Sequence, residues 1–275
     1  MAAVNSPIFL MFAGPNGSGK STITQAFRGR GLFPVNYVNA DEIAKTLVGS
    51  SDEIGYQAAQ MAEVQRQELM RRRQSLAFET VMSHPSKLAL LEQSRLLGYQ
   101  VILVFVGTNN PQINVERVAL RVQQGGHDVP TDKVIARYHR TLQLLPRAVE
   151  LANTVYIFDN SQTAELILQV VDGLQDIRQP IPNWVEMGLI LPCAERVLAR
   201  QAIKLFARDR NLELEFASLV KASYVGEIVM LDCYYGLQLV DGKLIVHDLT
   251  IVKLPQVSAS IIEISYDNGV TTISP

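Results

Sequence analysis

The stretch Gly14–Ser21, GPNGSGKS, decides the interpretation of this sequence. It follows the apolar run PIFLMFA at residues 7–13 and precedes a segment of helical character that begins near Lys20. Glycine loses more conformational freedom on folding than any other residue, so three glycines in this stretch need a physical reason. The pattern G-x-x-x-x-G-K-[ST] between a strand and a helix gives one, because a loop with few side chains can wrap its backbone N–H groups around a phosphate.

We call residues 14–21 the phosphate loop. The amino end of the helix that follows adds partial positive charge at the same place. Lys20 is expected to neutralise β- and γ-phosphate oxygens, and the Ser21 hydroxyl to ligate Mg²⁺, so the motif predicts ATP and Mg²⁺ as cofactors. The alternative is a glycine-rich turn without a ligand. The expected phosphate-binding residues are Gly14, Pro15, Asn16, Gly17, Ser18, Gly19, Lys20, Ser21 and Thr22.

Up to about residue 178, short apolar runs alternate with longer stretches of helical character. This rhythm is typical of a parallel sheet covered by helices, and near-continuous apolar runs suit strands that are buried on both faces. We therefore predict an α/β domain of the P-loop NTPase fold, with a mostly parallel sheet, over residues 1–178. The predicted strands are residues 8–14, 35–40, 76–81, 101–107 and 154–160.

The alternation stops after residue 178, where two prolines and the single tryptophan interrupt it. Residues 193–211 predict an amphipathic helix, and residues 226–254 predict short strands joined by tight turns, with Asp241-Gly242 as a hairpin turn. We predict a smaller α+β domain over residues 179–275, to which the pattern assigns no role.

Acidic side chains stand at the ends of two predicted strands. Asp41 follows the second strand, and Glu79 and Thr80 close the third. Open α/β sheets bind ligands at the carboxyl ends of their strands, so we expect these residues to face the phosphate loop. A carboxylate there can orient and deprotonate a hydroxyl that attacks a γ-phosphate. The structural alternatives are that Asp41 caps the helix after it and that Glu79 pairs with Arg95.

Arginines and a strand-end amide complete the candidate site. Transfer of a phosphoryl group spreads negative charge over three oxygens, which guanidinium groups are suited to stabilise. Surface salt bridges are the alternative role for these arginines. Asn160, after the last predicted strand, is a candidate for nucleotide binding, although turn chemistry alone also explains it. The arginines lie on two predicted helices and are Arg117, Arg121, Arg137 and Arg140.

Composition excludes several classes of function. The formal net charge of −2 argues against nucleic acid as a partner, and the apolar runs are too short to span a membrane. The first residues do not have the pattern of a secretory signal, so we expect a cytoplasmic protein. Cys193 and Cys233 have no metal-ligand spacing, which argues against a zinc site and against a disulfide scaffold.

Residues 7–178 resemble the zeta-toxin family of P-loop kinases, bacterial toxins and relatives that phosphorylate UDP-N-acetylglucosamine. The resemblance rests on AGPNGSGKST, VNADEIA, AFETVMS, ERVALRVQQGGHDVP and YIFDNS, in this order along the chain. It implies an ATP-dependent kinase with a hydroxyl acceptor, for which a nucleotide sugar such as UDP-N-acetylglucosamine is the first candidate. The C-terminal stretch YVGEIVMLDCYYGLQLVDGKLIVHDL resembles small β domains of the KfrB type.

The resemblance also implies roles for single residues. Asp41 matches the base that activates the sugar hydroxyl, Arg121 and Arg137 match the clamp on the γ-phosphate, and Glu79 with Thr80 matches the sugar-nucleotide site. A separate antitoxin is a candidate partner. Three alternatives stay open: a kinase for a nucleoside or an antibiotic, a kinase for a nucleic-acid end, and an ATP-dependent switch that transfers no phosphate to a small molecule.

Overall fold

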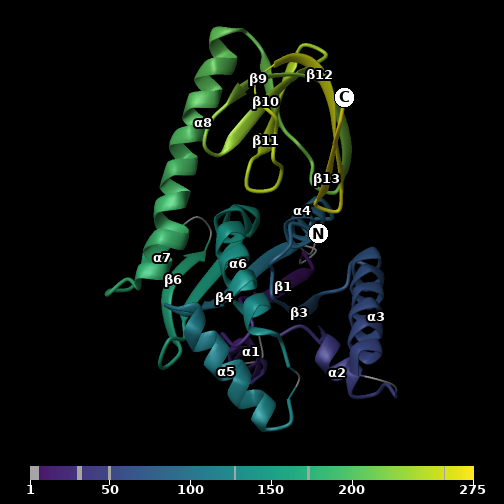
Figure 1. Ribbon diagram of the computed structural model, residues 1–275, viewed down its shortest axis with the longest axis vertical. Helices are drawn as coiled ribbons and strands as arrows, with labels where there is room; N and C mark the ends of the chain where they lie inside the picture. Colours follow the sequence, from purple (N-terminus) through teal and green to yellow (C-terminus); the bar gives the residue numbers. More distant parts are fainter. Residues whose placement is uncertain (1–5, 30–32, 49–50, 127, 172–173, 257) are drawn as a thin grey trace, which may run out of the picture.

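The computed structural model describes residues 6–29, 33–48, 51–126, 128–171, 174–256 and 258–275, which form two β-sheets with their helices (Figure 1). The first sheet and its helices occupy the lower part of Figure 1, and the second sheet lies above them. Within the described residues, none of the helices combines the length and the apolar composition needed to cross a lipid bilayer.

The first sheet has a parallel centre of five strands and an antiparallel edge of two, in the order β2-β3-β1-β4-β5-β6-β7. Since the five central strands are parallel, their carboxyl ends share the edge at which the phosphate loop follows β1. The strands are β1 (Ile8–Ala13), β2 (Asn36–Val38), β3 (Leu76–Thr80), β4 (Gln100–Gly107), β5 (Thr154–Asp159), β6 (Glu165–Val171) and β7 (Leu174–Ile177).

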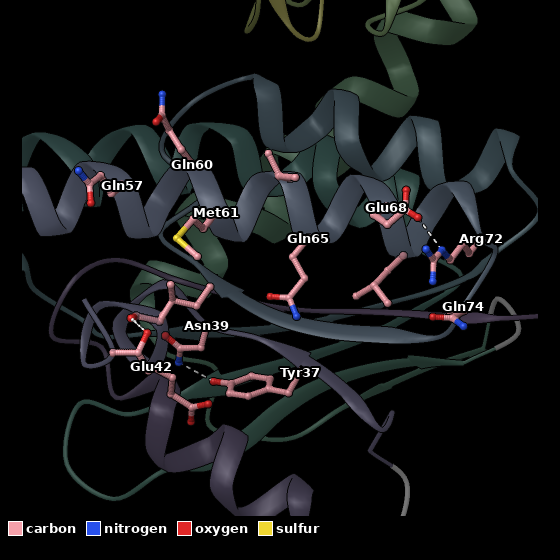
Figure 2. Close-up of a pocket in the computed structure, with 14 residues that line it drawn as sticks. Tyr37, Asn39, Glu42, Gln57, Gln60, Met61, Gln65, Glu68, Arg72 and Gln74 are labelled. Atoms are coloured by element: carbon pink, nitrogen blue, oxygen red, sulfur yellow. Dashed lines mark hydrogen bonds and ion pairs between the residues drawn. The ribbon is translucent and has the colours of Figure 1, made fainter. Parts of the chain in front are cut away.

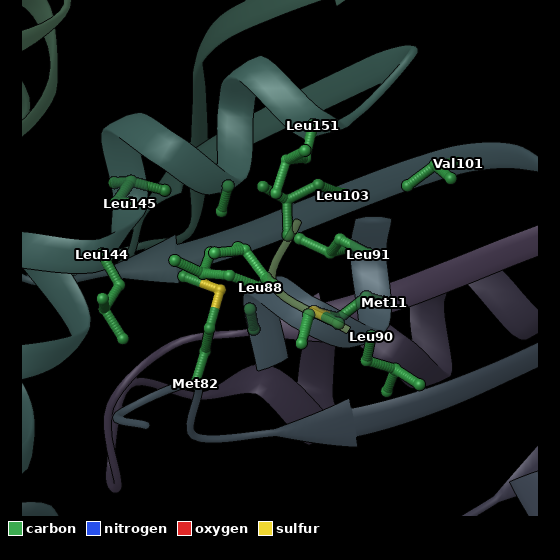
Figure 3. Close-up of a cluster of buried hydrophobic side chains, with 14 of the residues drawn as sticks. Met11, Met82, Leu88, Leu90, Leu91, Val101, Leu103, Leu144, Leu145 and Leu151 are labelled. Carbon is green, nitrogen blue, oxygen red and sulfur yellow. The ribbon is translucent and has the colours of Figure 1, made fainter. Parts of the chain in front are cut away.

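Alternate residues of β1 face opposite layers of helices. Phe9 and Met11 belong to a cluster with side chains of α3, α4 and α6, part of which Figure 3 shows. Leu10 and Phe12 point to the other face, where they pack with Ile23 of α1. β1 is thus buried on both faces, as its continuous apolar run indicated. The helices are α1 (Lys20–Arg28), α2 (Ala40–Ala44), α3 (Ser51–Arg71), α4 (Ser86–Leu96), α5 (Pro111–Gln123) and α6 (Thr131–Leu151).

The predicted fold of this region is confirmed: a mostly parallel α/β sheet covered by helices, with the five predicted strands close to their predicted bounds. The edge hairpin of β6 and β7 was not predicted. Residues of β7 are exposed along the whole strand, so no buried face marks it in the sequence.

The second sheet is mainly antiparallel, in the order β13-β12-β9-β10-β11-β8. Asp241 and Gly242, with φ of 47° and 80°, form the turn between β10 and β11, which confirms the predicted hairpin. The predicted helix is also present, as α8, and the region is α+β as expected. Its elements are α7 (Asn183–Val185), the π-helical turn η1 (Glu186–Ile190), α8 (Leu191–Asp209), β8 (Glu213–Phe216), β9 (Lys221–Leu231), β10 (Tyr235–Val240), β11 (Lys243–Asp248), β12 (Ser258–Asp267) and β13 (Val270–Ser274).

Trp184 anchors the segment after residue 178 to the first sheet. Its indole packs so closely on Gly107 that a Cβ there would lie 2.4 Å from the ring. The indole Nε1 donates a hydrogen bond of 2.7 Å to Asp159 Oδ1 at the end of β5. The hydrophobic cluster on this face of the first sheet continues into residues of the second sheet. The domain boundary near residue 178 stays a prediction.

A buried ion-pair network also joins the two regions. Arg196 of α8 is 1% exposed, and its guanidinium bonds Glu150 of α6 at 2.9 Å and Asp248 of β11 at 2.5 Å. Removal of one member would leave the remaining buried charges incompletely paired, which is costly in the interior of a protein. The network therefore fixes α8 and β11 relative to α6, the helix that also carries Arg137.

His247 lies in a buried polar network of the second sheet. Gln238 Nε2 donates to backbone carbonyls, including that of Ile262 at 2.9 Å, so its Oε1 accepts from His247 Nε2 at 3.0 Å. His247 Nδ1 then accepts from the Tyr266 hydroxyl at 2.7 Å. The network needs a neutral imidazole, and burial lowers the pKa of His247 to about 4.

This pKa predicts that acid destabilises the second sheet. The unfolded chain takes up the His247 proton below the ordinary pKa of about 6.5, whereas the folded chain takes it up only near 4, so stability is lost as pH falls between these values. The loss attributable to His247 is about 3 kcal/mol. Urea unfolding followed by circular dichroism between pH 8 and 4 measures it.

The readout is the difference in slope between the wild-type chain and the variants. His247→Gln should be less stable at pH 8 but should lose less stability between pH 6.5 and 4. His84→Gln, which changes an exposed histidine, should keep the wild-type slope. An unchanged slope in His247→Gln would contradict the assignment.

Candidate active site

The phosphate loop has a conformation that only glycine permits at its critical positions. Gly14 and Gly17 have φ of 147° and 76°. A Cβ on Gly14 would lie 2.1 Å from the carbonyl oxygen of Val106, and one on Gly17 would lie 2.4 Å from that of Asn114. Since both obstacles are backbone atoms, they cannot move aside cheaply. The glycines are therefore required by close backbone approach.

Lys20 is folded back over the loop that precedes it. Its Nζ donates to the carbonyl oxygens of Gly14 at 2.8 Å and Pro15 at 2.9 Å. The pKa of Lys20 is lowered to about 8, mainly by burial; Glu79 and Asp41 oppose the decrease, and Arg121 contributes to it. The ammonium group is thus held where anionic oxygens would stabilise it more than carbonyl oxygens do.

Residues of α5 and of the segment after β5 hold the loop in place. Asn114 Nδ2 donates to the carbonyl oxygen of Asn16 at 2.6 Å, and Asn114 in turn accepts from the Thr108 hydroxyl. Asn160 Nδ2 donates to the carbonyl oxygen of Ser18 at 2.8 Å. Asn160 therefore holds the loop in this structure, and a contact with nucleotide stays a prediction.

One cavity of about 480 Å³ brings the candidate residues from three strand ends together. It lies between the phosphate loop, the start of α2, the end of β3 and one face of α5. Its polar and charged walls fit a phosphate-bearing ligand. Its lining residues are Asn16, Gly17, Gly19, Lys20, Ser21, Thr22, Asn39, Ala40, Asp41, Glu79, Thr80, Val81, Arg117 and Arg121.

Asp41 has an exposed side chain in the first turn of α2 and lines this cavity. The alternative that Asp41 caps the helix is not what the structure shows: Asn39 is the cap, because its Oδ1 accepts from the Asp41 backbone N–H at 2.8 Å. Asn39 thereby leaves the Asp41 carboxylate for another partner.

Glu79 lies at the end of β3 and does not pair with Arg95, whose guanidinium bonds the Glu150 carbonyl oxygen at 3.1 Å instead. The Ser21 hydroxyl donates to Glu79 Oε2 at 2.8 Å, and the Tyr37 hydroxyl donates to Oε1 at 2.6 Å. The Ser21 hydroxyl, which the motif predicts as a Mg²⁺ ligand, is thus hydrogen-bonded to the Glu79 carboxylate.

The predicted arginines divide between two positions. Arg117 and Arg121 of α5 line the cavity. Arg137 of α6 does not line it, but its Nη1 lies 3.3 Å from Asn16 Oδ1 on the loop. Arg117 also donates to the carbonyl oxygen of Asn160 at 2.7 Å, which ties α5 to the end of β5. Placement at the cavity favours Arg117, already a candidate from the sequence, over Arg137 as the partner of Arg121.

A second cavity of about 1010 Å³ lies between α2 and α3, and Figure 2 shows its lining side chains. Tyr37, Asn39 and Glu42 form one side. Opposite them, α3 contributes the exposed apolar side chains of Met61 and Val64. Glutamine amides are spread along the same cavity: Gln57, Gln60, Gln65 and Gln74. Asn39 lines both cavities, so the second lies beside the site around Asp41.

The sequence analysis did not single out Tyr37 or Asn39. Both belong to the run VNYVNA, where alternate residues of a strand point to the same face. Polar side chains at alternate positions next to Asp41 could therefore have indicated that Tyr37 and Asn39 belong to the site. Asn114 gave no such signal, because its role depends on how α5 packs beside the loop.

The residues present fit Mg²⁺ and a triphosphate. Ser21 and Glu79 supply the oxygen donors that Mg²⁺ prefers, and the glycine cradle would be filled by any side chain. The buried Ser18 hydroxyl has no hydrogen-bond partner among the described residues, which suits a loop shaped for a ligand.

Comparisons with known proteins bear on the family and the fold of this chain. The family model of the zeta toxins matches residues 2–171. An uncharacterized protein of Haemophilus influenzae is 28% identical over 135 residues, which is 49% of this chain and 93% of that protein. The residues that the zeta-toxin family model matches include the phosphate loop and the ends of β2, β3 and β5. The resemblance of the C-terminal region to KfrB-type domains stays a prediction.

Two solved structures share the fold. The AvrRxo1-ORF1:AvrRxo1-ORF2 complex with sulphate ions aligns with a TM-score of 0.52 and 15% identity over 64% of this chain and 62% of that one. The same complex with ATP gives 0.51 and 15% over 63% and 62%. This chain thus spans less than two thirds of that neighbour. At such identity the likeness concerns the fold alone, whereas the family model covers more than half of the chain. The chain belongs to the zeta toxin family.

Proposed function

We propose that this chain is an ATP- and Mg²⁺-dependent kinase that transfers the γ-phosphoryl group to a hydroxyl of a small molecule. The observation that carries the proposal is the cavity in which Lys20, Ser21, Asp41 and Arg121 meet. A loop that cradles phosphates and a carboxylate that can take a proton from an alcohol are the two parts such a transfer needs. The likeness in fold to a complex solved with ATP supports the nucleotide.

In the proposed reaction the acceptor oxygen attacks the γ-phosphorus, the bond to the β-phosphate oxygen breaks, and ADP leaves. Asp41 accepts the hydroxyl proton. Lys20 leaves the loop carbonyls and binds phosphate oxygens, and the arginines of α5 stabilise the charge that spreads over the transferred group. Magnesium, when bound, neutralises charge on the β- and γ-phosphate oxygens.

We propose that the acceptor extends into the second cavity. Its apolar wall on α3 and its amide groups suit a flat ring with hydrogen-bonding edges, such as the base of a nucleotide sugar. UDP-N-acetylglucosamine, the substrate that the family resemblance implies, has both a free hydroxyl and such a ring. A separate antitoxin is the proposed protein partner, on the basis of family membership.

Replacement of Asp41 tests the assignment of the base. Asp41→Asn keeps the shape of the side chain but cannot accept the proton, so phosphoryl transfer should fall about 10²- to 10⁴-fold. Affinity for ATP should change little, because the carboxylate faces the acceptor. The measurement is transfer from labelled ATP to UDP-N-acetylglucosamine, with ATP binding followed by calorimetry. Asp209→Asn, on the exposed end of α8, is the matched control.

Normal turnover by Asp41→Asn would show that another group is the base. ATP hydrolysis by the wild-type chain that is indifferent to sugar nucleotides, nucleosides and antibiotics would instead favour the ATP-dependent switch over the kinase.

The pKa of Lys20 predicts how ATP affinity depends on pH. Phosphate binds the protonated amine of Lys20. In the free protein this amine loses its proton as pH rises through about 8. The affinity for ATP should be at its full value at pH 7 and should decline above pH 8. The phosphate, with a pKa of about 6, keeps its charge over this range, so the decline reports on Lys20. Calorimetric titrations between pH 7 and 9.5 measure this decline.

Lys20→Arg is the comparison for this pH dependence, because arginine stays charged over the whole range. Its ATP affinity should be weaker than that of the wild-type chain but nearly flat with pH. A flat profile in the wild-type chain would show that Lys20 does not titrate there.

A further inference from the structure

α8 carries leucines on the face that points away from the rest of the chain. Leu191, Leu198 and Leu205 are 42%, 65% and 49% exposed. At about 100° per residue they lie opposite the buried side of the helix. In Figure 1, α8 runs along the left side of the molecule, and no described element covers its outer flank. The buried residues on the other side are Arg196, Ile203 and Ala207.

The spacing of these leucines is that of a coiled-coil seam. They are seven residues apart, so in the heptad notation abcdefg they occupy three successive a positions. The d positions of the same heptads are also exposed, and they are Ala194, Gln201 and Arg208. One apolar face is enough for a helix that packs only on its own domain. α8 has a second face, with the period that another helix requires.

The residues that flank this stripe match a second α8 in parallel orientation. In a parallel pair, each g position meets the e position five residues later on the other helix. Val197 at g would therefore meet Ala202 at e of the second copy, and Lys204 at g would meet Asp209 at e. All four residues are exposed. Apolar thus meets apolar and basic meets acidic, and two-fold symmetry repeats each pair.

An antiparallel pair of α8 helices would lose this match. Its e flanks would face each other, and two of the residues on them, Glu195 and Asp209, are acidic. Lys204 would meet only g positions, none of which is acidic in α8. The charge pattern of α8 is therefore complementary to a second copy of itself in the parallel orientation.

We propose that this chain forms a two-fold symmetric dimer through α8, in which the leucines at the a positions of the two copies pack against each other in a parallel seam. The helix is already formed in the single chain, so association carries no cost of folding it. No residue of α8 lines the cavity around Lys20 and Asp41. The proposal is therefore independent of the proposed kinase function.

The oligomeric state of the full chain tests the seam. Sedimentation equilibrium between about 1 and about 100 µM should show the wild-type chain as a dimer that dissociates on dilution. Leu198→Glu places two charges in the seam and should weaken the dimer at least about 100-fold. Because Leu198 is exposed in the single chain, this variant should keep its fold, which circular dichroism checks. Leu96→Glu, at a leucine of α4 that is 74% exposed, is the matched control and should dimerise like the wild-type chain.

Charge reversal tests whether the partner is a second copy. Lys204→Glu alone and Asp209→Lys alone each create two like-charged pairs, so each should weaken the dimer roughly tenfold. An equimolar mixture of the two variants should form a heterodimer with the wild-type affinity. In the mixture each reversed charge meets its opposite on the other chain.

A disulfide tests the parallel orientation. In a chain that also carries Cys193→Ser and Cys233→Ser, the substitution Arg208→Cys should link two copies under mild oxidation, because equal d positions face each other only in a parallel pair. A wild-type chain that is monomeric at the highest concentration, or a Leu198→Glu chain that dimerises fully, would overturn the proposal. So would a dimer that shows neither the disulfide nor the rescue in the mixture.

Discussion

Backbone amides can surround a phosphate only where no side chain stands between them and the ligand, and the phosphate loop meets this requirement through its glycines. Gly14 and Gly17 approach backbone carbonyl oxygens so closely that a Cβ would collide with them. Asn114 and Asn160 then hold the loop from the strands and helices around it. These contacts hold the loop in its shape, which lowers the ordering cost of binding a phosphate.

The charges around the loop follow from its position at the carboxyl edge of a parallel sheet. This edge collects the ends of β1, β2 and β3, which place Lys20, Asp41 and Glu79 around one cavity. Burial makes the Lys20 charge costly. A bound triphosphate would offset that cost, whereas Asp41 lines the same cavity with an exposed side chain.

Much of this arrangement could be predicted from the sequence, because its parts are local. The phosphate loop is one motif, and the central strands are apolar runs whose order along the chain places Asp41 and Glu79 at strand ends. The remainder depends on long-range packing. From the sequence, Tyr37 is indistinguishable from a core aromatic residue, because its contact with Glu79 depends on the pairing of β2 with β3. The choice between Arg117 and Arg137 depends on how α5 and α6 lie against the loop. The ion pairs of Arg196 with Glu150 and Asp248 join residues far apart in the chain, so no local pattern indicates them.

The central claim is that the phosphate loop binds the β- and γ-phosphates of a nucleotide. The most direct test is the affinity of the wild-type chain for ATP, ADP and AMP in the presence of Mg²⁺, measured by calorimetry. Each additional phosphate gains charge-assisted hydrogen bonds, so ATP should bind more than about tenfold tighter than AMP, with ADP between them. Equal affinities for the three nucleotides, or binding of none, would contradict the account.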